Sequence, residues 1–132
     1  MSEQENKQIV QSIFESFGRG DLDGLLDNIT ADVIWNAPVS SLVPYYGARL
    51  GQDGVKDFFQ QLGSNVTFES FELTELIAEG DKVVALGREQ GRVGKTGKMF
   101  DNEWAIVFTV SGGKVTNFRL YENTAAVAEA FR

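Results

Sequence analysis

One long segment with strictly alternating side chains constrains this chain more than any other. Residues 99–110 read Met-Phe-Asp-Asn-Glu-Trp-Ala-Ile-Val-Phe-Thr-Val, which is the period of a half-buried strand. One face of this strand carries Asn102, Trp104, Ile106, Phe108 and Val110. Because that face is apolar apart from an amide and an indole N–H at its start, it predicts a small-molecule pocket with a few fixed polar groups.

The length and charge of the chain limit its organisation and its partners. With 132 residues, it is long enough for one domain with a sizeable core, so we predict a single domain over residues 1–132. There are 19 acidic and 12 basic residues, giving a net charge of −7, and the basic residues are scattered. We therefore expect no nucleic acid and no anionic membrane surface as a partner.

The chain has no Cys and no His. This composition excludes disulfides and thiolate nucleophiles, and it removes the usual ligands of zinc and haem and the usual base of a catalytic triad. We expect no metal and no cofactor. Residues 1–17 lack the apolar core of a signal peptide and no run approaches the length of a membrane span, so we expect a cytoplasmic location.

The spacing of apolar residues predicts helices first and long strands afterwards. Helices are expected at residues 2–17, 21–29 and 53–63 and from residue 123 or 124, and strands at residues 32–36, 66–78, 82–93, 99–110 and 114–122. The strand at 66–78 changes parity and is expected to contain a bulge. The last three strands form an antiparallel meander, and the apolar loop 38–51 either closes a pocket or packs on the core.

Glu89 is the side chain most suggestive of chemistry. Alternation places it on the inner face of its strand, beside the face that carries Trp104, and there a carboxylate loses hydration. Its pKa is expected to rise from about 4.3 toward neutrality, as a general base needs. We expect Gly87 and Gly91 to leave space for a ligand. Two alternatives are a salt bridge to an arginine and a register slip that exposes Glu89.

Other inner-face residues are candidates for contact with a substrate. They are Asn36, Tyr46, Asn102, Trp104, Phe118, Leu120 and Glu122. Each also has a structural alternative: core packing for the aromatic residues, capping or turn roles for the asparagines, and a helix-dipole role for Glu122. An inner carboxylate with neutral donors is the arrangement needed to move a proton from a carbon next to a carbonyl group and to stabilise the enolate.

Several short motifs follow one another in a recognisable order. They include Gly20-Asp21-Leu22-Asp23, Asp32-Val33-Ile34-Trp35, Tyr46-Gly47, Ile77-Ala78-Glu79-Gly80-Asp81, Thr96-Gly97-Lys98 and Phe118-Arg119 with Tyr121. Together with the order of elements, they resemble the SnoaL-like, ketosteroid isomerase-related group of the nuclear transport factor 2-like superfamily. The resemblance implies an α+β fold, a cone-shaped barrel in which a strongly bent, mostly antiparallel sheet wraps around the N-terminal helices. It also implies a homodimer through the outer face of the sheet, with Val107, Val115 and Tyr121 as contributors.

The catalytic residues of known enzymes in this superfamily are only partly present at the matching positions of this chain. In limonene epoxide hydrolase, the central aspartate of the catalytic trio matches Glu89, but the arginine matches Gly87 and the second aspartate matches Leu120. Its water-positioning asparagine matches Asn36. Scytalone dehydratase-like chemistry depends on histidine, which this chain lacks, and the ketosteroid isomerase set has no counterpart that we can place. One inner carboxylate and an apolar cavity remain.

The sequence thus predicts that the chain binds a small hydrophobic, carbonyl-containing molecule in an apolar pocket. It further predicts that the chain isomerises or cyclises this molecule, as a polyketide cyclase-like enzyme does, by cofactor-free acid/base proton transfer with Glu89 as the proton carrier. The alternative is a non-catalytic ligand-binding or dimerisation domain, in which Glu89 is salt-bridged and side chains such as Phe118 and Leu120 fill the cavity.

Overall fold

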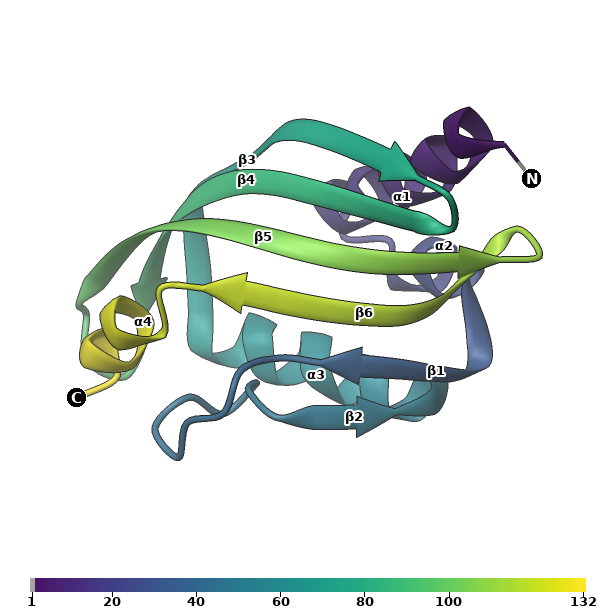
Figure 1. The fold of residues 1–132 in the computed structure, drawn as a ribbon. Coiled ribbons are helices and arrows are strands. Elements are labelled where there is room, and N and C mark those ends of the chain that lie inside the picture. Colours follow the sequence, from purple (N-terminus) through teal and green to yellow (C-terminus); the bar gives the residue numbers. More distant parts are fainter. Residues whose placement is uncertain (1) are drawn as a thin grey trace.

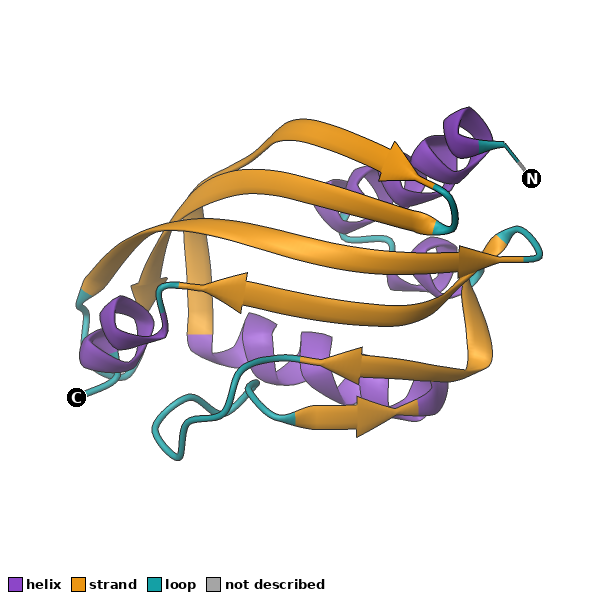
Figure 2. Cartoon of the chain, in the orientation of Figure 1, coloured by secondary structure: helices purple, strands orange, loops and turns teal. Residues whose placement is uncertain are grey.

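A strongly bent sheet with helices on its concave side forms the architecture of the computed structural model, which describes residues 2–132 (Figures 1 and 2). The elements are α1 (Glu3–Arg19), α2 (Leu22–Leu26), β1 (Ile29–Asn36), β2 (Ala48–Leu50), α3 (Gly51–Asn65), β3 (Val66–Glu79), β4 (Lys82–Val93), β5 (Met99–Ser111), β6 (Lys114–Glu122) and α4 (Thr124–Ala130). The strand order is β2-β1-β6-β5-β4-β3, and only β1 and β6 pair in parallel. The predicted α+β class and bent, mostly antiparallel sheet are confirmed, although the sheet stays open rather than closing into a barrel.

Helix α1 begins at a capping box and ends at a glycine. The Ser2 hydroxyl accepts a hydrogen bond from the Glu5 backbone N–H, and the Glu5 carboxylate accepts one from the Ser2 N–H. Gly18 does not end the helix, which continues to Arg19. It ends at Gly20, which adopts the left-handed conformation with φ of 70°. Within residues 2–132, no helix has both the length and the apolar character needed to cross a membrane.

Several element boundaries differ from those expected. Strand β1 begins at Ile29, three residues early, because Ile29 pairs with Val115 instead of ending a helix. Helix α3 begins two residues before Asp53 and continues to Asn65. The loop 38–51 contains β2, which adds a short antiparallel edge strand to β1.

The sheet register confirms the meander and explains one wrong orientation. Strand β3 contains the predicted bulge, with register shifts between Phe68 and Ser70 and again between Leu73 and Glu75. Val115 was expected on the outer face, but it is fully buried. The register shift that follows Thr109 in the pairing of β5 with β6 inverts the alternation at this point, so Val115 packs in the core.

Candidate functional site

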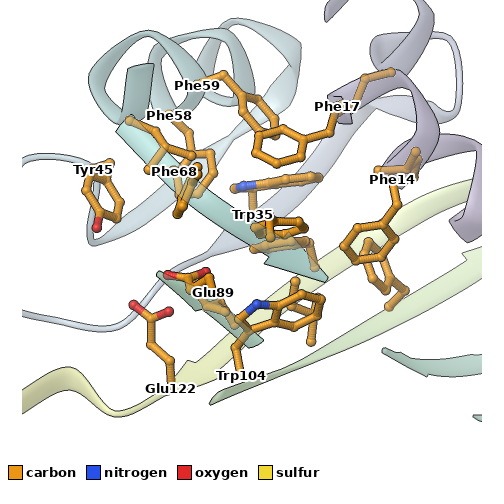
Figure 3. Close-up of a pocket in the computed structure, with 18 residues that line it drawn as sticks. Phe14, Phe17, Trp35, Tyr45, Phe58, Phe59, Phe68, Glu89, Trp104 and Glu122 are labelled. Atoms are coloured by element: carbon orange, nitrogen blue, oxygen red, sulfur yellow. The ribbon is translucent and has the colours of Figure 1, made fainter. Parts of the chain in front are cut away.

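A cavity of about 70 Å³ lies between the concave face of the sheet and helices α1 and α3 (Figure 3). Aromatic side chains from six elements form most of its wall: Phe14, Phe17, Trp35, Phe58, Phe59, Phe68, Phe71, Trp104, Phe108 and Phe118. The only carboxyl groups among the lining residues belong to Glu89 and Glu122, and the only phenol belongs to Tyr45. The predicted apolar pocket with few polar groups is therefore present.

The space above two glycines of β4 is occupied by aromatic rings and not left for a ligand. A Cβ atom at Gly87 would overlap the indole of Trp104 and the backbone oxygen of Glu72, and one at Gly91 would overlap the ring of Phe100. The expectation that these glycines leave open volume was wrong. Their role is to let large rings of β5 lie flat against β4.

Glu89 lies where strand alternation placed it, on the inner face of β4 opposite Asn102 of β5. Its side chain is buried, and no ion pair within residues 2–132 includes it. Burial, followed by the negative charge of Glu122, raises its pKa to about 8, and the hydrogen bond from the Asn102 side chain opposes the rise. This environment therefore disfavours the ionised form of Glu89, and neither the salt bridge nor the register slip considered above occurs.

Glu122 lies at the same end of the cavity, on the last residue of β6. Its carboxylate accepts hydrogen bonds from the Tyr46 hydroxyl and, at 3.0 Å, from the amide of Asn102. Burial raises the pKa of Glu122, while both hydrogen bonds lower it. The structure thus pairs two carboxyl groups in different surroundings, and Glu122 has the donors that favour its ionised form.

The two adjacent tyrosines have different places in the site. Tyr45 lines the cavity. Tyr46 is not among the lining residues, and its hydroxyl donates a hydrogen bond to the Glu122 carboxylate. Arg49 holds both residues in place, because its guanidinium donates to the backbone oxygens of Tyr45 at 2.9 Å and of Tyr46 at 3.1 Å. Sequence reasoning chose Tyr46 as the residue in contact with a substrate, but Tyr45 is the one that faces the cavity.

The other predicted site residues divide into three positions. Trp104, Phe118 and Leu120 line the cavity. Asn102 is buried next to it and reaches it through Glu122. Asn36 does not line the cavity but a second pocket, which includes Arg119 and shares Leu120 and Glu122 with the cavity. Alternation along β1 places Asn36 on the opposite face from Trp35.

Trp35 is the principal site residue that sequence reasoning missed. It is almost fully buried, lines the cavity, and stacks on Phe118 with a centroid distance of 3.8 Å and an interplanar angle of 1°. The signal was present in the sequence, because Val33 and Trp35 share one face of a strand whose other face begins with Asp32. Within residues 2–132, no cluster of three or more potential metal-ligating His, Cys, Asp or Glu residues occurs.

Comparison with known proteins identifies the family. The model of the SnoaL-like domain matches residues 10–118. The chain belongs to the SnoaL-like domain family. No curated protein matches it.

Solved structures share the fold of this SnoaL-like domain over nearly its whole length. A nuclear transport factor 2-like protein from Burkholderia xenovorans LB400 is 36% identical, with 100% of this chain and 99% of that chain covered and a TM-score of 0.92. TerC, co-crystallised with polyporic acid, is 23% identical over 96% of this chain and 98% of that chain, with a TM-score of 0.86. A protein from Mesorhizobium loti assigned as a SnoaL-like polyketide cyclase is 17% identical over 87% and 97% of the two chains, with a TM-score of 0.73. The last two show likeness of fold alone.

Proposed function

We propose that this SnoaL-like domain binds a small hydrophobic, carbonyl-containing molecule in the aromatic cavity and isomerises or cyclises it without a cofactor. The observation that supports this proposal is the buried carboxyl group of Glu89, which lines an apolar cavity without a cationic partner among residues 2–132. A carboxyl group in that environment has a pKa near the operating pH, where one group both accepts and returns a proton.

The proposed reaction is a proton transfer between two atoms of the substrate. The ionised Glu89 takes a proton from the carbon next to the carbonyl group, and the electron pair of the broken C–H bond forms an enolate. Glu89 then returns the proton to another carbon of the conjugated system. Alternatively, the enolate carbon attacks a second carbonyl group and closes a ring, and Glu89 gives the proton to the alkoxide oxygen that this carbonyl group becomes. In either case no oxidant or reductant is required.

Two features of the cavity support this chemistry. The Tyr45 hydroxyl remains protonated because burial and the charges of Glu122 and Glu89 raise its pKa above the usual value, so it can donate to a developing enolate oxygen. Trp104, Phe118 and Leu120 form an apolar wall that orients the body of the substrate and excludes water. Relatives of this fold include proteins assigned as isomerases and a polyketide cyclase, which agrees with the proposed reaction class.

The second candidate is a non-catalytic ligand-binding or dimerisation domain, and one observation favours it. The cavity of about 70 Å³ is smaller than the roughly 300–1,000 Å³ of typical ligand pockets. Phe118 packs directly on Trp35, so aromatic rings already fill much of the space. Under the first proposal, some of these rings move when the ligand enters.

The two candidates are distinguished by hydrogen exchange on a simple ketone. We expect the protein to accelerate the exchange of deuterium from D2O into the carbon next to the carbonyl of 1-tetralone, as followed by NMR. Glu89→Gln removes the base and is expected to lower the rate at least about 100-fold. Glu103→Gln, on the exposed face of β5, is the matched control and keeps the rate. If Glu89→Gln changes stability but not exchange or binding, the domain is non-catalytic.

The homodimer and the cytoplasmic location remain predictions. For the dimer, Tyr121 is half exposed on the outer face of the sheet and Val107 is partly exposed, whereas the buried Val115 cannot contribute. Light scattering at several concentrations measures the oligomeric state. A dimer that Tyr121→Glu dissociates would support the outer face as the interface.

A further inference from the structure

Both tryptophans of the sequence lie in the cavity with unsatisfied hydrogen-bond donors. The chain contains two Trp residues, Trp35 and Trp104, and each lines the cavity. The Nε1–H groups of both are buried and have no acceptor within residues 2–132. Since buried N–H groups nearly always have a hydrogen-bond acceptor, two buried donors without one in the same cavity need an explanation.

The packing around each indole prevents its N–H from turning outward to water. Trp104 stacks near-parallel with Phe14, at a centroid distance of 5.6 Å, and with Phe71, at 5.2 Å, and its benzo edge lies over Gly87. Trp35 stacks flat on Phe118. These contacts fix the direction of both N–H groups, so the donors are held ready before any ligand arrives.

The two nitrogens are directed toward the acidic end of the cavity. In Figure 3, the nitrogen edge of Trp104 is turned toward Glu89, and the nitrogen of Trp35 lies on the side of its ring nearer to Tyr45 than to Phe14. Neither indole donates to Glu89 or Glu122. A bound molecule with oxygen acceptors at this end would satisfy both donors.

The sheet register separates the two donors. Trp35 pairs with Phe118 and Trp104 pairs with Glu122, so their partners on β6 are four residues apart. This corresponds to roughly 13 Å along the strand and two strand spacings, or about 10 Å, across the sheet between the backbone positions. The indoles thus extend into the cavity from widely separated backbone positions, which favours two separate acceptor atoms over one shared atom.

We propose that Trp35 and Trp104 are specificity-determining donors that select a flat, ring-bearing ligand with two separate acceptor oxygens. This inference rests on the proposed binding of a small molecule in the cavity and adds the number and placement of its oxygens. Flat rings suit walls made of stacked aromatic side chains. A protonated amine, which the carboxyl groups alone would favour, has no acceptor for either indole.

The test uses three bicyclic compounds that differ in their oxygens: menadione has two carbonyl groups, 1-tetralone has one, and 2-methylnaphthalene has none. The chain lacks Cys, so the quinone has no thiol to attack. Each indole gives one ¹H–¹⁵N signal, assigned with Trp35→Phe and Trp104→Phe. We expect menadione to shift both indole protons downfield, 1-tetralone to shift one, and 2-methylnaphthalene to shift neither downfield.

The variants supply a second measurement. Each Trp→Phe change keeps an aromatic ring but removes the N–H and part of the ring. The lost ring area weakens the binding of both compounds, so menadione affinity is expected to fall about three- to tenfold more than that of 2-methylnaphthalene. The number of indole signals that move in the wild type does not depend on their assignment, so a variant that does not fold leaves the test valid.

Three outcomes would overturn the inference. If menadione and 2-methylnaphthalene bind equally tightly and no indole proton moves downfield, binding rests on apolar contact alone, and the proposed function survives without the inference. A downfield shift of both indoles with 1-tetralone would remove the requirement for two oxygens. If none of the three compounds perturbs a cavity resonance, the binding on which the proposed function depends fails as well.

Discussion

The side-chain amide of Asn102 donates a hydrogen bond of 3.0 Å to Oε1 of Glu122. The oxygen of the same amide accepts a 3.0 Å hydrogen bond from the backbone N–H of Asn123, which caps α4. Because Asn102 also stands opposite Glu89 in the sheet, one amide links both carboxyl groups of the cavity to the start of the last helix. The acidic end of the cavity is therefore positioned by strand pairing and helix capping together.

Asn102→Ala is expected to raise the pKa of both carboxyl groups. The Asn102 side chain lowers the pKa of Glu89 and of Glu122, and its removal leaves their ionised forms less stabilised. It also leaves the Asn123 N–H without its acceptor, at a cost of about 1–3 kcal/mol. Carboxyl-carbon NMR titration and urea unfolding measure the two effects. Asn117→Ala, in β6 but away from the carboxyl groups, is the control. If the pKa values of Glu89 and Glu122 are the same in Asn102→Ala as in the wild type, Asn102 does not link the two carboxyl groups.

Glu89→Gln is expected to remove a pH dependence of stability. The unfolded chain releases this proton near pH 4.5, whereas the folded protein holds it up to about pH 8, so the free energy of unfolding falls as pH rises between these values. At about 1.4 kcal/mol for each pKa unit, the loss is a few kcal/mol. Urea unfolding of wild type and variant from pH 5 to 8.5 tests this.

The variant is expected to be the more stable protein at pH 8.5, with its advantage shrinking toward pH 5. Glu122 contributes a residual slope of the same sign because its pKa is also raised. The exposed Glu103→Gln variant is expected to follow the wild type. Parallel profiles for wild type and Glu89→Gln would show that Glu89 titrates normally.

Tyr46→Phe and Tyr45→Phe form a matched pair with different expected effects. Loss of the Tyr46 hydroxyl removes a donor to Glu122 and is expected to raise the pKa of that carboxyl group. Tyr45 makes no hydrogen bond to either carboxyl group, so Tyr45→Phe is expected to move the Glu122 titration less and instead to slow exchange on 1-tetralone. NMR titration and exchange rates separate the two roles. Equal effects of both variants on Glu122 would contradict this division.

Gly87→Ala is expected to destabilise the protein strongly, and Gly63→Ala is not. A Cβ atom at Gly87 overlaps the Trp104 ring and a β3 carbonyl group, and overpacking of this kind costs about 1–3 kcal/mol or more. Gly63 lies in α3 with open space around it, so alanine there is expected to stabilise by about 0.5–1 kcal/mol through helix propensity. Thermal unfolding compares the two. A Gly87→Ala protein as stable as wild type would show that Trp104 can move.

Much of the site was predictable because it depends on strand alternation. The inward direction of Glu89, Trp104 and Phe118 follows from a period of two residues. The unbroken pairing of β4 with β5 preserves it for Glu89 and Trp104, and Phe118 pairs with the inward Phe108 of β5. The same reasoning failed at Val115, because one register shift reverses the faces of a strand. It also failed at Gly87, because alternation tells which way a residue points and not what meets it there.

The sequence by itself determined the order of the helices and strands, the faces of most of the long strands, and the lack of thiol and imidazole chemistry, since each depends on residue identity and short-range spacing. Only the tertiary structure decided that Tyr45 and not Tyr46 faces the cavity, and that both indole N–H groups lack an acceptor among residues 2–132. These features depend on how side chains from distant strands and helices fill a shared space, and that packing is not encoded in any local pattern.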